Sequence, residues 1–208
     1  GLQKIGSGTL ILSGANSYTG STAVDAGILN IRHSTALGGT AGATVVADGA
    51  VLEIQGGISV GAEGLTVSGT GIASAGVLRN VSGNNTWGGS VTLNAASRIN
   101  SDSGTLTLSS GMTGAGYGLS VGGVGNVVIN GSIGTGAGSL TKDGSGTLTL
   151  GGVNSFSGAT VVNAGSLIAA SGALGSTSSV TVNGAQLQAV NYNGSAPLSV
   201  DASGYAVI

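Results

Sequence analysis

Residues able to perform catalysis are scarce in this chain. Its single histidine, His33, follows Arg32, and a Ser-His-Asp triad would have to use it. The matching stretch of an internal repeat, residues 169–171, contains neither His nor Arg, and so we expect His33 to be a solvated turn residue. The absence of cysteine excludes disulfides and thiolate metal sites. We predict no catalytic, cofactor-binding or metal-binding residues.

Carboxylates are the remaining candidates for acid–base chemistry. Hydrolysis of a polysaccharide needs two of them at a defined separation. Asp25 and Asp48 could lie one coil apart on one face if the strands stack as coils, and they are the best candidate pair. The seven acidic residues are nevertheless scattered singly, which favours solvated charges: Asp25, Asp48, Glu53, Glu63, Asp102, Asp143 and Asp201. The arginines Arg32, Arg79 and Arg98 could form a modest stripe for glycans or carboxylates, although single solvated charges fit better.

Aromatic residues are the better candidates for surface contacts, because exposed rings commonly serve as platforms for sugars and proteins. There are six: Tyr18, Trp87, Tyr117, Phe156, Tyr192 and Tyr205. Tyr18 and Phe156 occupy equivalent repeat positions, which favours a structural role at the corner of a coil. We predict surface contacts at Trp87 and Tyr117.

Composition excludes several classes of protein. The chain has 208 residues, of which 43 are glycine and one is proline, and its hydrophobic share of 40% with a net charge of −2 indicates a folded chain. Five basic residues leave no patch for nucleic acid. No apolar run approaches the roughly 20 residues that a membrane-spanning helix needs, and so we predict no membrane insertion.

An internal repeat organises the sequence. Residues 2–31 and 140–169 align without a gap, and with small gaps the likeness covers about 2–53 and 140–187. Matching pairs include Lys4 with Lys142, Asn16 with Asn154, Tyr18 with Phe156, Gly6 with Gly144, and Gly27 with Gly165. Glycines at matching positions are expected to turn corners between stacked strands.

The local pattern predicts strands throughout. Runs such as Thr105–Leu108 alternate apolar and hydroxyl residues, and Gly-containing pairs such as Asp48-Gly49 and Asn193-Gly194 separate them. The sequence shows no apolar period of 3.6 residues, the pattern that would predict a helix. The few aromatics disfavour a sandwich, whereas a repeat favours a solenoid. Coils of about 20 residues would give roughly ten coils and a rod about 50 Å long, as one segment over 1–208.

The two repeat copies resemble the passenger-associated transport repeat of bacterial autotransporters. The residues concerned are the Lys, the Gly-x-Gly-Thr-Leu-x-Leu that follows, the Asn-x-Tyr-x-Gly-x-Thr with Phe156 in place of Tyr in the second copy, and a final Gly-x-Leu. This resemblance implies an all-β, right-handed parallel β-helix that is exported and displayed outside the cell as an adhesin, biofilm protein or surface fibre. The sequence contains no translocator barrel, so the resemblance implies a passenger fragment or a relative secreted by another route.

The expected function is that of a structural and adhesive module without enzymatic activity. Open edge strands at the ends of a coil stack are templates for another copy, which predicts head-to-tail self-association. A surface protein or a glycan is the other expected partner. The alternative is a polysaccharide-active β-helix enzyme, a lyase or hydrolase, with clustered charges in a cleft.

Overall fold

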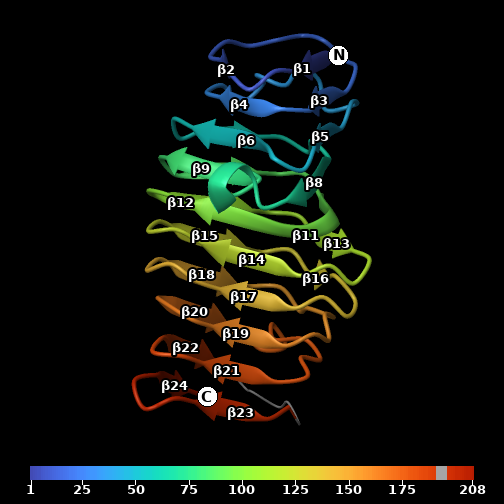
Figure 1. The fold of residues 1–208 in the computed structure, drawn as a ribbon. Coiled ribbons are helices and arrows are strands. Elements are labelled where there is room, and N and C mark those ends of the chain that lie inside the picture. The colour runs from blue at the N-terminus through green and yellow to red at the C-terminus, as the bar shows by residue number, and fades with distance from the viewer. Residues whose placement is uncertain (191–195) are drawn as a thin grey trace.

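The chain forms an elongated stack of coils, with its N-terminus at one end and its C-terminus near the other (Figure 1). A computed structural model describes residues 1–190 and 196–208. The predicted Asn193-Gly194 turn and Tyr192 lie outside the described residues. The strands are paired in parallel, and the described residues contain a single 3-10 turn, Ile72–Ser74. The prediction of an all-β parallel solenoid is confirmed.

The strands fall into three ladders, which we call faces 1, 2 and 3. Face 1 contains β1 (Leu2–Lys4), β3 (Thr22–Val24), β5 (Thr44–Val46), β8 (Leu65–Gly69), β13 (Met112–Gly114) and β16 (Ile133–Gly134). Face 2 contains β2 (Thr9–Leu12), β4 (Gly27–Ile31), β6 (Ala50–Gln55), β9 (Leu78–Ser82), β14 (Leu119–Gly122), β17 (Leu140–Lys142), β19 (Thr160–Val162), β21 (Val180–Val182) and β23 (Leu198–Val200). Face 3 contains β7 (Ser59–Val60), β10 (Asn85–Trp87), β12 (Thr105–Leu108), β15 (Asn126–Ile129), β18 (Thr147–Leu150), β20 (Ser166–Ala169), β22 (Gln186–Ala189) and β24 (Tyr205–Val207).

The core is a set of inward-facing ladders whose members come from successive coils. Strands alternate buried and less buried residues, as in β18 and β20, because neighbouring side chains of a strand point to opposite faces. One interior ladder on face 2 has ten members: Leu10, Leu29, Leu52, Leu78, Ile99, Val121, Lys142, Val162, Val182 and Val200. Successive members are 18 residues apart at the closest, from Val182 to Val200, and 26 at the widest, from Leu52 to Leu78. Coils of about 20 residues are therefore confirmed.

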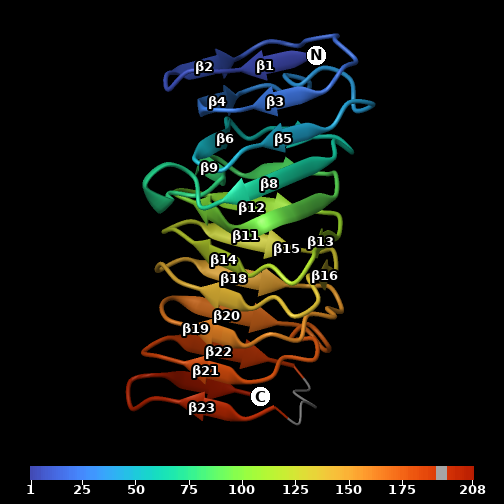
Figure 2. The same ribbon diagram turned by 45° about the vertical axis from the view of Figure 1, so that its right-hand side comes forward.

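The long strand β11 (Val91–Ser101) belongs to two faces at once. Its first half pairs with β8 and β13 on face 1, and its second half pairs with β9 and β14 on face 2. Figures 1 and 2 show it crossing the stack below β8 and β9 and above β14. The repeat copies consequently occupy different faces, because the lysine strand of the first copy, β1, lies on face 1 and that of the second copy, β17, lies on face 2.

Candidate functional site

The matched lysines of the two repeat copies point inward and cap a corner of the coil. Lys4 Nζ donates to the carbonyl oxygens of Ile5, Gly6 and Ala26 at 3.0, 2.6 and 2.9 Å. Lys142 Nζ donates in the same way to Asp143, Gly144 and Ala164 at 2.7, 2.7 and 3.1 Å. An ammonium group has three donors, so the three carbonyls of each corner satisfy it completely. The third carbonyl belongs to the next coil, and the lysine therefore joins two coils.

Two glycines shape each lysine-capped corner. Gly6 and Gly144 have φ values of 72° and 73°, and Gly27 and Gly165, one coil further on, have 69° and 65°. A Cβ at Gly165 would lie 2.6 Å from the carbonyl oxygen of Gly144 and closer still to that of Gly146. Gly27, Gly144 and Gly165 therefore need glycine both for the left-handed backbone and for the close approach of the preceding coil, whereas Gly6, in the first coil, needs it for the backbone alone. The prediction that repeat glycines turn corners is confirmed at these four positions.

The matched asparagines also join coils. Asn154 accepts a hydrogen bond from the Ile133 N–H at 2.6 Å through Oδ1 and donates to the Ala173 carbonyl through Nδ2. In the first copy, Asn16 Nδ2 donates to the Ala36 carbonyl at 2.7 Å. The matched lysines and asparagines of the repeat thus connect successive coils through hydrogen bonds to backbone groups.

A chain of eight polar side chains runs along the stack, mainly on face 2, and we call it the charge ladder. Its members, in bonding order, are Arg32, Asn30, Glu53, Arg79, Asp102, Asn100, Arg98 and Asp143. Arg79 contacts Glu53 at 3.1 Å and Asp102 at 2.6 Å. The ladder contains three positive and three negative groups, so its charges are balanced internally.

Arg98 and Asp143 form the most complete ion pair of the charge ladder. Both terminal nitrogens of Arg98 donate to the Asp143 carboxylate, at 2.7 and 2.6 Å. The hydrogen bonds with Asp143 raise the pKa of Arg98, although burial lowers it. The two residues are 45 positions apart, and Gly122 lies between them in the coil that they straddle. A side chain at Gly122 would overlap both groups, and the ion pair therefore depends on this glycine.

Gly122→Ala is expected to break the Arg98–Asp143 pair and to lower the free energy of unfolding by about 1 kcal/mol, because the pair is partly exposed. Urea denaturation of Gly122→Ala, Arg98→Met and the double variant measures this coupling. The glycine substitution should cost much less in the Arg98→Met background. An equal cost in both backgrounds would show that the substitution acts on something other than the ion pair.

The expectation of singly scattered charges is wrong for Glu53, Asp102 and Asp143. Glu53 and Asp102 come from different coils and converge on Arg79, and Arg98 is paired with Asp143. Coil stacking brings these groups together because residues about one or two coil lengths apart in sequence become neighbours. A stripe of free arginines for glycan carboxylates is also wrong for Arg79 and Arg98, since carboxylates of the chain itself already occupy both guanidinium groups.

The candidate catalytic pair lies in turns of neighbouring coils, Asp25 between β3 and β4 and Asp48 between β5 and β6. Their side chains have separate surroundings. Asp25 accepts a hydrogen bond from Gln3 at 2.6 Å, and the Asp48 carboxylate lies against Gly69. Asp25 and Asp48 therefore lie in neighbouring coils, as predicted. Among the described residues, no side chain is hydrogen-bonded to both carboxylates.

Glu63 is a buried carboxyl group, 2% exposed, that accepts a hydrogen bond from Thr44 Oγ1 at 2.9 Å. Burial raises its pKa and the Thr44 hydrogen bond lowers it. A raised pKa suits a general acid. However, an interior position places Glu63 away from any polysaccharide bound outside the stack.

His33 lies in the turn after β4, and Thr35 contacts it through both the backbone N–H, at 3.2 Å to Nδ1, and the side-chain hydroxyl at 3.1 Å. These contacts fit the expected turn residue.

Among the described residues, no group of three His, Asp or Glu side chains could hold a metal ion. No helix in the described ranges has the length and apolar character required to cross a membrane.

The predicted surface contact at Trp87 is wrong, because its side chain has no exposed surface. Trp87 ends β10 and, like Asn85 two residues before it, is buried in the stack. Its register partners on the neighbouring strands are Val60 and Leu108. Tyr117 lies in the turn between β13 and β14 and is 38% exposed, and its surface contact stays a prediction. Phe156 is buried and Tyr18 half-buried, as expected for corner residues.

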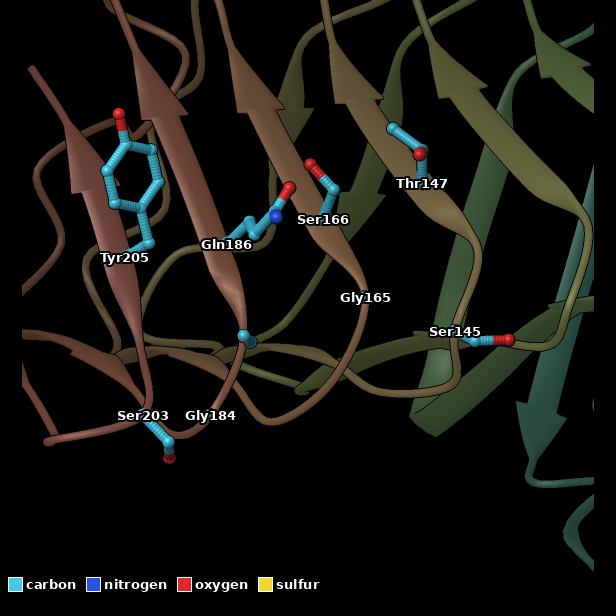
Figure 3. A pocket seen from close by; sticks show the side chains of 9 residues that line it. Ser145, Thr147, Gly165, Ser166, Gly184, Gln186, Ser203 and Tyr205 are labelled. Atoms are coloured by element: carbon cyan, nitrogen blue, oxygen red, sulfur yellow. The ribbon is translucent and has the colours of Figure 1, made fainter.

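An open hollow of about 480 Å³ lies beside the last strands of face 3. Thr147, Ser166, Gln186 and Tyr205 occupy matching positions on the neighbouring strands β18, β20, β22 and β24. Figure 3 shows their side chains in one row. The glycines Gly165 and Gly184 also line the hollow. Tyr205 is one of the six aromatic candidates, whereas the row that it forms with Gln186, Ser166 and Thr147 was not predicted; matching strand positions in successive coils are the signal that could have found it.

The stacked coils, capped corners and two repeat copies define a parallel β-solenoid with coil-forming repeats. A family model described as the passenger-associated-transport-repeat matches residues 2–31 and 140–169, the same segments that form the capped corners. The resemblance of the two copies to the passenger-associated transport repeat is therefore confirmed.

A curated relative extends the likeness beyond the two copies. The chain is 36% identical over 167 residues to the adhesin BmaC autotransporter of Brucella suis biovar 1 (strain 1330). The match covers 80% of this chain and 4% of that adhesin, so the chain corresponds to a small part of the relative's length. No solved structure gave a significant match.

Proposed function

We propose that this chain is a structural and adhesive segment of an exported bacterial surface protein. The observation that carries the proposal is the 36% identity to part of an autotransporter adhesin, which continues through the coils between the repeats. The architecture supports it, because a stack of parallel coils joined by lysines, asparagines and ion pairs can hold a binding surface at a distance. Localisation outside the cell, a role in biofilm or fibres and head-to-tail self-association belong to the same proposal.

The proposal includes the absence of enzymatic activity. Three of the seven carboxylates are held by arginines in the charge ladder, and a fourth, Glu63, lies in the interior. Only Asp25, Asp48 and Asp201 remain as candidates for the pair of carboxylates that glycoside hydrolysis needs. A polysaccharide-active enzyme is the less supported alternative.

Beads coated with the purified chain test the adhesive role. We expect them to attach to host-cell monolayers or to a bacterial lawn more than beads coated with albumin or with the heat-unfolded chain. Equal attachment of all three kinds of bead would contradict the proposal. In parallel, incubation with pectin and alginate should release no product. Turnover that disappears in Asp48→Asn would instead establish the enzymatic alternative.

A further inference from the structure

The hollow on face 3 has the groups and the spacing to bind a linear sugar chain. Tyr205 is 61% exposed, and its ring stands at one end of the row formed with Gln186, Ser166 and Thr147 (Figure 3). Aromatic rings with a polar edge offer sugars both a stacking surface and a hydrogen-bonding group. The row as a whole supplies hydroxyl and amide groups, which can donate and accept.

The spacing of the row follows from strand pairing. Thr147, Ser166, Gln186 and Tyr205 are register partners on four neighbouring parallel strands. Neighbouring strands are about 4.8 Å apart, so the row repeats at about the length of one sugar ring and spans roughly 14 Å. A straight oligosaccharide of about three rings would therefore meet a similar set of groups at each step.

Two corner glycines, Gly165 and Gly184, line the hollow beside the row. Gly165 and Gly184 have φ values of 65° and 61°, a conformation that other residues adopt only with strain. Asp201 orders the adjacent turn, since its carboxylate accepts hydrogen bonds from the Gly184 N–H at 2.9 Å and the Ser203 N–H at 3.0 Å. The coil corners therefore fix the backbone that borders the hollow.

The charge of the hollow selects the kind of sugar. None of the residues lining it carries a formal charge, and the nearby Asp201 adds a negative one. Acidic polysaccharides would find no cation to pair with and would be repelled. From these features we propose that the row Thr147, Ser166, Gln186 and Tyr205 binds a neutral linear glycan. This inference rests on the proposed adhesive function and specifies its partner.

Binding to soluble oligosaccharides tests the site directly. Isothermal titration of the purified chain with cellohexaose, maltohexaose and chitohexaose is expected to detect binding of at least one of them and no binding of oligogalacturonate. Tyr205→Ala should weaken binding about tenfold, while Tyr205→Phe should retain most of it because the ring remains. Val124→Ala is the control, an exposed apolar residue in the turn between β14 and β15 and not part of the row, and should bind as the unchanged chain does.

Several results would overturn the proposal: no binding of any neutral probe, preferential binding of oligogalacturonate, or affinity that Tyr205→Ala leaves unchanged. The bead assay separates this inference from the adhesive function. If Tyr205→Ala beads attach as well as unchanged beads, adhesion stands and the glycan site is wrong. If the chain binds a neutral probe through Tyr205 but its beads do not attach, the site stands and the adhesive function is wrong.

Discussion

Replacing Lys142 with methionine is expected to lower the free energy of unfolding by about 2–4 kcal/mol at neutral pH. Methionine retains most of the apolar stem, which is 2% exposed in the interior ladder between Val121 and Val162. The substitution therefore removes mainly the three hydrogen bonds to corner carbonyls. Relief from burying the ammonium group works in the opposite direction and keeps the expected loss below what three charge-assisted hydrogen bonds would give alone.

Urea denaturation and hydrogen exchange together measure the effect of Lys142→Met. The urea midpoint should fall, and amide protection should be lost first at β17 and β19, because each coil of a solenoid depends mainly on its neighbours. Thr141→Ala is a matched control, since Thr141 is the neighbouring residue on β17 and is not fully buried. A methionine variant as stable as Thr141→Ala would mean that the corner carbonyls do not need the lysine.

Lys142 should also make stability depend on pH. Burial lowers the pKa of Lys142 to about 8, Asp143 raises it and Arg98 lowers it. A lysine in the unfolded chain titrates near about 10.4. Between these two values the unfolded chain binds more protons than the folded chain, and so the free energy of unfolding rises with pH. The unchanged chain should show this rise, and Lys142→Met should lack it. Because the other titrating groups are the same in both chains, the difference between their two pH profiles reports Lys142 alone.

The coil and its corners could be predicted from sequence because they are local. Period-two strands, glycines at matching positions and the ungapped repeat all report on residues a few positions apart. What the repeat did not reveal is the shift of face. From Leu10 to Lys142 the interior ladder takes six coils, and Leu148, the repeat counterpart of Leu10, lies on the following strand. Equivalent residues of the two copies therefore lie six coils apart along the stack and on neighbouring faces.

The charge ladder was missed because coils differ in length. Glu53 and Arg79 are 26 residues apart, while Arg79 and Asp102 are 23 apart, so no single period aligns them. Opposite charges about one coil apart were the available signal. The burial of Trp87 was not predicted, for another reason. Its flanking Asn and Gly residues suggested an irregular segment, yet a three-residue strand suffices to turn its ring inward.

Gly165→Ala is expected to destabilise the chain by about 3 kcal/mol or more. A left-handed backbone costs a residue with a Cβ about 1–2 kcal/mol, and overlap in a packed interior adds about 1–3 kcal/mol. Here the overlap is with the carbonyl oxygens of Gly144 and Gly146, which are backbone atoms held by the coil. These atoms cannot swing aside as the end of a long side chain would, and so the corner around Lys142 must open.

Gly49→Ala separates the two contributions. Gly49 has a φ of 77°, but a Cβ there would meet no atom within 4 Å, so this variant carries the backbone strain without the overlap. Its cost should be about 1–2 kcal/mol, measured by the same urea titration. The excess cost of Gly165→Ala over Gly49→Ala then reports the closeness of coils at the corner. Equal costs would mean that left-handed conformation alone, and not the approach of the preceding coil, requires glycine at the repeat corners.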